Sequence, residues 1–309
     1  MADSDNPLYE ELRPAAFAIA YRMLGRVSEA EDVVQDALLR LHGVLESGEQ
    51  IESPRAYVAT LVTRLSIDVL RSARVRRETY VGEWLPEPLV TSEADDPAGH
   101  AELADSLSVA FLVLLESLSP EQRAALLLHD VFDYPFEDVA AIVGKSEANA
   151  RQLAARARRH VAERRPRYET SSEKRDELAR RFFAAAGEGD LETLESLLAE
   201  DVVLHGDGGG KVPALARALH GRGRVARTLS AWARQARRIA GMTVDPAEIN
   251  GQPGALMLDG EGRLVAVWAL DIAEGRVQAI NSVVNPDKLE HLGEVADVRA
   301  LLRGRTGRP

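Results

Sequence analysis

Residues 119–161 read SPEQRAALLLHDVFDYPFEDVAAIVGKSEANARQLAARARRHV, and this stretch decides how the central part of the chain folds. Ser119 and Gln122 form a capping box, which predicts the start of a helix. A following helix ends at Gly144, and Ser146 is placed to cap another. Two helices joined by one tight turn, the second of them basic, are typical of a DNA-binding helix-turn-helix.

The last helix of this motif combines one apolar stripe with a polar, cationic remainder. In the DNA-binding interpretation, Arg158 and Arg159 neutralise phosphates, while side chains near the helix N-terminus reach base edges in the major groove. A helical bundle that never touches DNA is the alternative, and the cluster of arginines argues against it. The predicted DNA contacts are Glu147, Asn149, Arg151, Gln152, Arg156, Arg158 and Arg159.

The first 77 residues predict helices only, and their charge changes sign along the chain. Residues 28–50 carry six acids and one base, whereas residues 51–77 carry six bases and two acids. Ser28 with Glu31 predicts one helix start, and Ser53 with Pro54 predicts another. Taken alone, each charged face is an ordinary solvated helix side. Two basic helices in a chain of net charge -11 instead predict two directed contacts with DNA phosphates.

Bulk composition excludes several classes of protein. The 309 residues include no cysteine, so disulfides, thiolate metal sites and cysteine nucleophiles are ruled out. No apolar run approaches the length of about 18 residues that a membrane span needs, and the acidic N-terminus is unlike a secretory signal. We therefore expect a cytoplasmic protein without membrane contact, metal or cofactor, monomeric when free.

After residue 175 the sequence changes in character. Two short helical runs reach about residue 199, and alternating segments such as RLVAVWALDIA and RVQAINSVV then predict strands. The dipeptides Asp259-Gly260 and Glu274-Gly275 predict tight turns between antiparallel strands. This C-terminal part is therefore predicted to be an α+β domain rather than a parallel α/β domain.

Several stretches resemble a known family. SEAEDVVQDALLRLH resembles the core-polymerase-binding helix of sigma region two, and RAYVATLVTRLSIDVLRSARVRRE is similar to the segment that melts and reads the minus-ten promoter element. The central motif resembles region four, which reads the minus-thirty-five element. Regions one and three are missing, as is typical of extracytoplasmic-function sigma factors. TYVGEWLPEP, DGGGK and NPDKL resemble three motifs of the subfamily with a fused SnoaL-like domain, with Glu83 standing where proline is expected.

The resemblance implies a multidomain protein: two all-α sigma domains followed by an α+β SnoaL-like cone. The expected boundaries are 1–78 for region two, 79–100 for a linker, 101–167 for region four, 168–175 for a second linker, 176–295 for the cone and 296–309 for a flexible tail.

It also implies two partners, core RNA polymerase and promoter DNA, and assigns residues to each. The expected polymerase contacts are Asp32, Gln35, Asp36 and Arg40. The expected DNA contacts of region two are Arg64, Asp68, Arg71, Arg74, Arg76 and Arg77.

For the C-terminal domain we expect a regulatory role, inhibiting or assisting, through contacts with the linker. Asp207 and Lys211 are expected to reach the linker, where Trp84 would act as an aromatic anchor. The expected interdomain residues are Trp84, Leu85, Pro86, Asp207, Gly208, Gly209, Gly210, Lys211, Asn285, Pro286, Asp287, Lys288 and Leu289.

Two other functions stay open at this point. The chain could be a conventional transcription factor whose C-terminal domain binds a small effector, although nothing in the sequence supports a ligand. It could also be a cyclase or isomerase fused to a DNA-binding module, with an acid or base in the cone. The candidate catalytic residues are His205, Asp207, His220, Asp259 and Asp271. No spacing singles one of them out, and turn chemistry accounts for Asp207 and Asp259, so we predict no catalytic residue.

Overall fold

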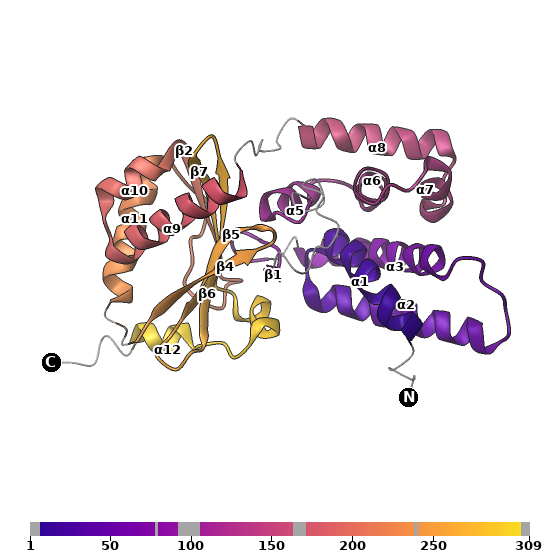
Figure 1. The fold of residues 1–309 in the computed structure, drawn as a ribbon, viewed down its shortest axis with the longest axis horizontal. Coiled ribbons are helices and arrows are strands. Elements are labelled where there is room, and N and C mark those ends of the chain that lie inside the picture. The colour runs from indigo at the N-terminus through magenta and orange to yellow at the C-terminus, as the bar shows by residue number, and fades with distance from the viewer. Residues whose placement is uncertain are drawn as a thin grey trace. The chain divides into compact units, whose positions relative to one another are not determined.

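Figure 1 shows the chain in a computed structural model, which describes residues 7–77, 80–91, 106–162, 171–237, 239 and 241–303. The chain forms two compact units. Unit 1 combines Met1–Thr79 with Phe111–Arg165, and unit 2 combines Tyr80–Ala110 with Pro166–Pro309. The two helical regions thus share one unit, and the segment that joins them belongs to the C-terminal unit. The predicted boundaries at residues 78, 79, 100, 101, 167 and 168 lie outside the described residues.

The N-terminal part of unit 1 consists of three helices, α1 (Pro7–Leu24), α2 (Val27–Glu46) and α3 (Pro54–Arg77). Leu24 and Leu41 are fully buried among them. The predicted helix start at Ser53 is confirmed, since its hydroxyl accepts a hydrogen bond from Ala56 N at 3.3 Å. The predicted capping of α2 by Ser28 is wrong: the helix already starts at Val27, and its N-cap residue, Arg26, makes no side-chain cap bond.

Helical spacing in the sequence predicts a buried stripe of Val58, Leu61, Val62, Leu65 and Val69 on α3, and only Val58 and Val62 of these are buried. Leu61, Leu65 and Val69 are only half-buried, whereas Ala59 and Ile67 are buried. The reason is that α3 packs against α1 and α2 and also against α6 and α7 of the central region. Helical periodicity predicts one apolar stripe and cannot show that a second region of the same unit covers part of the remaining surface.

The central part of unit 1 contains α5 (Val109–Leu115), α6 (Pro120–Leu126), one π-helical turn (Leu127–Val131), α7 (Phe136–Val143) and α8 (Glu147–Ala162). The capping box of Ser119 with Gln122 is confirmed in both directions. Gly144 ends α7 in the left-handed conformation with φ of 65°. Ser146 caps α8 through Asn149 N at 3.4 Å. The predicted helix-turn-helix is therefore confirmed.

Unit 2 contains a seven-stranded mixed sheet in the order β1-β4-β5-β6-β7-β2-β3. Its strands are β1 (Val90–Thr91), β2 (Leu198–Asp207), β3 (Leu219–His220), β4 (Thr243–Ile249), β5 (Gln252–Leu258), β6 (Leu264–Ala273) and β7 (Arg276–Val283). The antiparallel pairs β5–β6 and β6–β7 confirm the predicted hairpins, with positive φ at Glu274 and Gly275 in the second turn. The first and last long strands, β2 and β7, pair in parallel, which the turn signals do not reveal.

Helices cover one face of this sheet, as Figure 1 shows for α9 (Ser172–Glu188), α10 (Leu191–Leu197) and α11 (Arg222–Ala236). A large apolar core joins the two layers, with Phe182, Leu229 and Leu270 essentially inaccessible to solvent. After β7 the described residues form two 3-10 turns (Pro286–Lys288 and Glu290–Leu292) and α12 (Val298–Arg303).

A second, smaller core contains residues from outside the C-terminal domain. Leu85 and Val109, which come from the two ends of the segment joining the helical regions, pack with Ile249 of β4 and with Leu289. The described part of the expected linker is therefore a component of unit 2. In the described residues, no helix has the length and apolar character of a membrane span.

Candidate functional site

Helix α8 presents all of its predicted DNA-contacting side chains to solvent. The apolar stripe that includes Ala150, Ala154 and Ala157 is buried against α6 and α7, and the seven predicted residues lie outside it. Two of the arginines carry acidic partners in this structure. Arg151 pairs with Glu147 at 2.5 Å, and Arg158 pairs with Asp130 at 2.5 Å, which raises the pKa of Arg158.

Two of the side chains on α3 that are predicted to contact DNA bond instead to the central helices of the same unit. The guanidinium of Arg64 donates to the carbonyl oxygens of Ala141 and Ile142, at the end of α7, at 2.9 and 3.0 Å. Arg71 pairs with Glu121 of α6 at 2.6 Å and with Asp68 at 3.5 Å.

The ion pair between Arg71 and Glu121 shifts both groups toward their charged forms. Although burial raises the pKa of Glu121, the hydrogen bond from Arg71 and nearby backbone bonds outweigh it, and the pKa is lowered. The pKa of Arg71 is raised, chiefly by its hydrogen bond to Glu121. The side chains of Arg74, Arg76 and Arg77 lie outside the described residues.

A buried arginine joins the two helical regions more firmly. Arg123 of α6 donates to Met23 O of α1 at 2.5 Å and to Leu115 O at 2.6 Å, and it pairs with Glu116 at 2.9 Å. Its side chain is 3% exposed, and burial lowers its pKa to about 9, so it stays charged at neutral pH. This residue lies on α6, before the helix-turn-helix, and sequence reasoning missed it because a lone arginine beside a capping box carries no distinguishing pattern.

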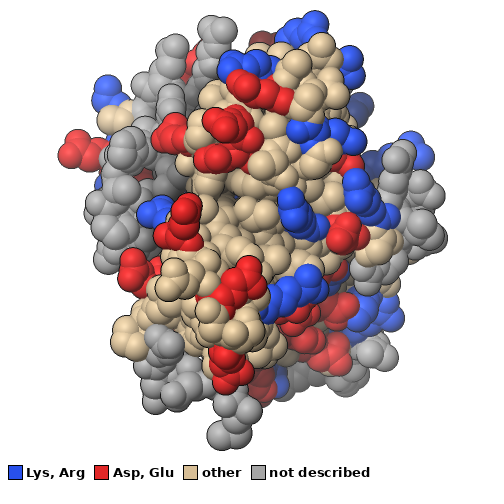
Figure 2. All heavy atoms as spheres, turned by 90° about the vertical axis from the view of Figure 1, so that its right-hand side faces the viewer, with Lys and Arg blue, Asp and Glu red and all other residues tan. Residues whose placement is uncertain are grey.

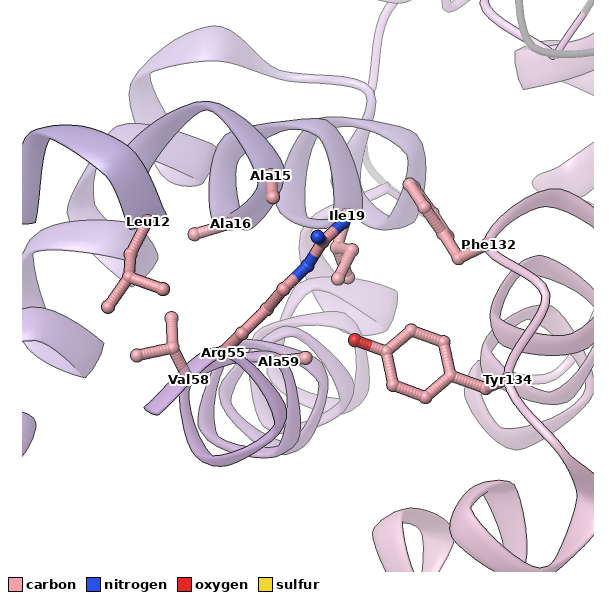
Figure 3. Close-up of a pocket in the computed structure, with 9 residues that line it drawn as sticks. All are labelled: Leu12, Ala15, Ala16, Ile19, Arg55, Val58, Ala59, Phe132 and Tyr134. Carbon is pink, nitrogen blue, oxygen red and sulfur yellow. The ribbon is translucent and has the colours of Figure 1, made fainter. Parts of the chain in front are cut away.

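A small cavity of about 40 Å³ remains where these regions meet (Figure 3). Its walls come from α1 and α3 on one side and from Phe132 and Tyr134 on the other. In Figure 3 the side chain of Arg55 extends across it toward Ile19, and the hydroxyl group of Tyr134 points into it from the other side. Burial raises the pKa of Tyr134. The volume is enough for only a few water molecules, so we regard it as imperfect packing rather than as a ligand site.

The predicted polymerase-binding residues share one face of α2. Asp32, Gln35 and Arg40 are exposed, and Arg40 holds the half-buried Asp36 through two bonds at 2.9 and 3.1 Å. On the face of the molecule drawn in Figure 2, basic and acidic side chains alternate, and neither sign covers it alone. This mixture agrees with the ion pairs of unit 1, in which several arginines already have acidic neighbours.

In unit 2 the three motifs of the C-terminal resemblance come together around one buried ion pair. Lys288 Nζ lies 2.6 Å from Asp207 Oδ2, with side-chain exposures of 2% and 0%. The same ammonium group donates to Leu85 O and lies 4.4 Å from the ring of Trp84 and 5.0 Å from that of Tyr80. The carboxylate, the carbonyl oxygen and the two aromatic faces around the ammonium group offset the free energy that it costs to remove this cation from water.

The carboxylate of Asp207 has its remaining sites filled by the linker and the glycine loop. It accepts from Tyr80 Oη at 2.5 Å, from Leu85 N at 2.9 Å and from Gly209 N at 3.1 Å. Asn285 closes the arrangement by donating to Tyr80 Oη at 3.0 Å. We call this set the linker clamp: Tyr80, Trp84, Leu85, Asp207, Asn285 and Lys288.

The glycine loop lies too close to its neighbours for larger residues. Gly209 has φ of 57°, and a Cβ there would stand 2.3 Å from the side chain of Asn285. Gly210 has φ of 71°, and a Cβ there would stand 3.0 Å from Val81 of the linker. Both positions therefore combine a left-handed backbone with close approach, which explains the glycine run without a phosphate-binding role.

One expected contact differs in the structure. Lys211 does not reach the linker; it pairs instead with Asp287 at 2.5 Å on the surface, and Lys288 is the cation that contacts the linker. The sequence alone does not show which of these two lysines contacts the linker, because that depends on which of them is buried in the folded domain. Glu83 stands at the position where proline is expected, and its Oε2 lies 3.2 Å from His205 Nδ1.

A further linker contact, on the opposite edge of the sheet, was not anticipated. Asn250, in the turn between β4 and β5, is fully buried and bonds to both Leu89 and Leu107. His291 also lies 2.8 Å from Pro88 O. An Asn-Gly dipeptide following a strand could have drawn attention to this turn, but β4 itself was not predicted because Pro246 interrupts its pattern.

The residues considered for catalysis hold structural roles where their contacts are described. Asp259 accepts from the backbone and guanidinium of Arg263; burial raises the pKa of Asp259, but these bonds outweigh it and the pKa is lowered. Asp271 accepts from Asn281 at 2.9 Å, and His220 is exposed. Within the described residues, no group of three or more acidic or histidine side chains is arranged to hold a metal ion.

Comparison with known proteins agrees with this geometry. Models of sigma-70 region 2 and sigma-70 region 4 match residues 8–76 and 108–161, and a model of the SnoaL-like domain matches residues 179–287. The ECF RNA polymerase sigma factor SigJ of Mycobacterium tuberculosis is 40% identical over 289 residues, which cover 91% of each chain. A probable ECF RNA polymerase sigma factor of the same species, SigI, is 31% identical over 277 residues, covering 89% of this chain and 91% of the relative.

The crystal structure of M. tuberculosis SigJ matches the whole fold, with a TM-score of 0.74 at 38% identity over 92% of this chain and 97% of that one. The chain therefore belongs to the ECF RNA polymerase sigma factors, in the form that carries a C-terminal SnoaL-like domain. It is an alternative sigma factor, which binds core RNA polymerase and directs it to promoter DNA.

Proposed function

We propose that the fused SnoaL-like domain modulates promoter recognition by holding the linker between region two and region four. The observation that carries this proposal is the buried pair of Asp207 and Lys288, which bonds to the linker at Tyr80 and Leu85. A regulatory domain that only happened to be fused would not need to bury linker residues 85–88 and to pair Val90 and Thr91 with its own strand β4.

In this proposal the DNA and polymerase contacts follow the sequence-based assignments. Region two docks on the polymerase through the exposed face of α2 and reads the minus-ten element through the basic end of α3. Region four places the N-terminal half of α8 in the major groove at minus thirty-five. The protein acts in the cytoplasm, and its C-terminal domain has no catalytic role.

We further infer that unit 1 has a closed arrangement in this structure, in which region two and region four contact each other and cannot both bind a promoter. Positions minus ten and minus thirty-five are about 25 base pairs apart, or roughly 85 Å of duplex. Arg64 of region two, however, bonds directly to the end of α7 in region four. Arg71 likewise has Glu121 as partner in place of a phosphate. Promoter binding then requires the two regions to separate and these arginines to exchange partners.

Run-off transcription with core RNA polymerase tests the proposal, using the region upstream of the protein's own coding sequence as template. Full-length protein should support a transcript that core enzyme alone does not make. Lys288→Met should change the yield, a rise indicating a restraining domain and a fall a supporting one. Lys211→Met is the matched control, because it removes the same charge from an exposed ion pair and should leave the yield unchanged.

Two outcomes would contradict the proposal. Equal yields from Lys288→Met, Lys211→Met and the unmodified protein would exclude modulation through the linker clamp. Absence of any transcript, together with DNA binding that does not need polymerase, would favour a conventional effector-binding transcription factor instead.

A further inference from the structure

Asn250 occupies an unusual position for a hairpin turn. It lies between β4 and β5 with φ of 53°, followed by Gly251 with φ of 70°, as the two central residues of an Asn-Gly turn require. Turns of this kind normally lie at the surface. Asn250 is instead 0% exposed. The turn geometry explains why asparagine and glycine occur here, but it does not explain why the side chain is buried.

The buried side chain bonds to two separate parts of the linker. Its Oδ1 accepts from Leu89 N at 3.0 Å, and its Nδ2 donates to Leu107 O at 3.1 Å. Its own backbone N–H donates to Leu89 O at 2.8 Å. An amide is suited to this role because it offers a donor and an acceptor on neighbouring atoms.

Neighbouring contacts hold the Leu89 end in the same place. Val90 pairs with Ile249 in the β1–β4 ladder, and Gly251 N donates to Thr91 Oγ1 at 3.0 Å. The Leu107 end is followed by Val109, which is 4% exposed in the smaller core of unit 2 and is the first residue of α5. Both ends of the intervening segment are therefore fixed to the C-terminal domain, one just after region two and the other at the start of region four.

These bonds shorten the reach of the linker considerably. Because both bond to one amide group, Leu89 N and Leu107 O lie within about 9 Å of each other. Whatever path the residues between them take, a chain from 89 to 107 could extend to about 60 Å. The difference, about 50 Å, corresponds to about 15 base pairs of duplex DNA at 3.4 Å each. The side chain of Asn250, together with the contacts of Val90 and Val109, therefore limits how far region four can move from region two.

We propose that Asn250 is a positioning residue that limits the promoter spacings this sigma factor can use. By joining Leu89 to Leu107 it keeps the linker short, so that only a narrow range of distances between the minus-ten and minus-thirty-five elements permits both regions to bind. This inference rests on the proposed function, since it assigns to the linker contacts a measurable consequence for promoter choice. It predicts that releasing the Leu107 end widens the range of accepted spacings.

Asn250→Asp is the sharpest variant to test this. Aspartate has the same shape, tolerates a positive φ and can still accept from Leu89 N. It cannot donate to Leu107 O, and it places a carboxylate oxygen beside that carbonyl. Asn250→Gly is the second variant, because it removes the whole side chain without backbone strain. Thr91→Val is the matched control: it removes the bonds of the Thr91 hydroxyl to Gly251 and Glu248, and it leaves the bond between Asn250 and Leu107 intact.

The measurement is run-off transcription with core RNA polymerase and full-length protein on templates whose spacer is shortened or lengthened in single-base-pair steps. The unmodified protein and Thr91→Val should share one narrow optimum. In Asn250→Asp, transcript from spacers several base pairs away from that optimum should rise about fivefold relative to transcript at the optimum, the change in equilibrium expected from one lost hydrogen bond. Asn250→Gly loses both side-chain bonds, so its rise should be at least as large.

Three results would overturn the inference. An unchanged spacing profile in both Asn250 variants would show that the amide does not limit reach. A loss of transcript by the same factor at every spacing would show a purely structural role. Absence of transcript from the unmodified protein at every spacing would instead remove the proposed function itself, and the inference with it.

Discussion

The contacts between the two helical regions of unit 1 and the linker clamp of unit 2 both include an ion pair, but the two ion pairs differ in burial. In unit 1, Arg71 meets Glu121 with 59% of the arginine side chain exposed. In unit 2, Lys288 meets Asp207 with 2% and 0% exposed. Exposed ion pairs contribute about 0–1 kcal/mol, whereas removing one partner of a buried pair costs about 3–5 kcal/mol. The first kind can be exchanged for a phosphate; the second is suited to a lasting connection.

The closed arrangement of unit 1 nevertheless includes one buried side chain, Arg123, that bonds across the interface between the two helical regions. Its guanidinium satisfies carbonyl oxygens on both sides of the interface and is almost fully buried. The interface therefore combines one buried anchor with weaker bonds at Arg64 and Arg71. We expect the weaker bonds to yield first when DNA competes, and three substitutions test this difference.

Lys288→Met should have the largest effect. It leaves the carboxylate of Asp207 buried without its cation, and we expect the free energy of unfolding of unit 2 to fall by about 3–5 kcal/mol. Denaturant unfolding followed by tryptophan fluorescence measures it, since Trp84 lies beside the ammonium group. Lys211→Met should change the same transition by about 1 kcal/mol at most, because its partner Asp287 is exposed. Equal losses in the two variants would refute the distinction between the two lysines.

Arg123→Met should come next, with a loss of about 2–3 kcal/mol from unit 1. The thioether fills part of the space but cannot donate to Met23 O or Leu115 O, and Glu116 loses its cationic partner. Hydrogen exchange of the amides in α1 and α6 would show it as faster opening of the contact between these helices. Unaltered exchange there would mean that the two regions are held together by other contacts.

Glu121→Gln should have the smallest effect, about 0–1 kcal/mol, since its partner Arg71 is largely exposed. Loss of this competitor should nevertheless make Arg71 more available to DNA. Fluorescence anisotropy with a labelled promoter duplex and the polymerase holoenzyme would record a modestly tighter complex for the variant. A weaker complex would contradict competition between Glu121 and DNA for Arg71.

The same pair predicts a dependence on pH. The folded-state pKa of Glu121 is lowered from its ordinary value of 4.5, so the carboxylate binds fewer protons in the folded than in the unfolded state. Its contribution is therefore fully present above pH 4.5 and is lost as the pH falls through the lowered folded-state value. The difference in stability between the unmodified protein and Glu121→Gln should shrink across that range; a difference that stayed constant would show that the ion pair is not its source.

Local signals in the sequence predicted much of the fold and the members of the site. Ser119, Gln122, Gly144 and Ser146 define the helix-turn-helix because caps act within a few residues of the chain. The Glu274-Gly275 dipeptide defines a hairpin for the same reason. The stripe of Ala150, Ala154 and Ala157 marks which face of α8 is buried and, by exclusion, which face is exposed to solvent.

Long-range pairing lay beyond those signals. The parallel pair of β2 with β7 joins residues about 80 positions apart, and no local pattern encodes such a register. The strand β4 was not predicted because Pro246 interrupts its sequence pattern. In the structure β4 pairs with the linker strand β1.

By itself, the sequence determined three kinds of segment: a basic recognition helix, an acidic helix face and three motifs near the linker and the C-terminus. Only the tertiary structure decided which charged residues are buried. Lys211 and Lys288 are alike in the sequence, yet one lies in solvent and the other between Asp207, Trp84 and Leu85. Asn250 likewise becomes important only because two distant linker carbonyls and one amide meet at its turn. The physical reason is that the energy of a polar group depends on its solvent and partners, and both are fixed by chain segments that lie far away in sequence.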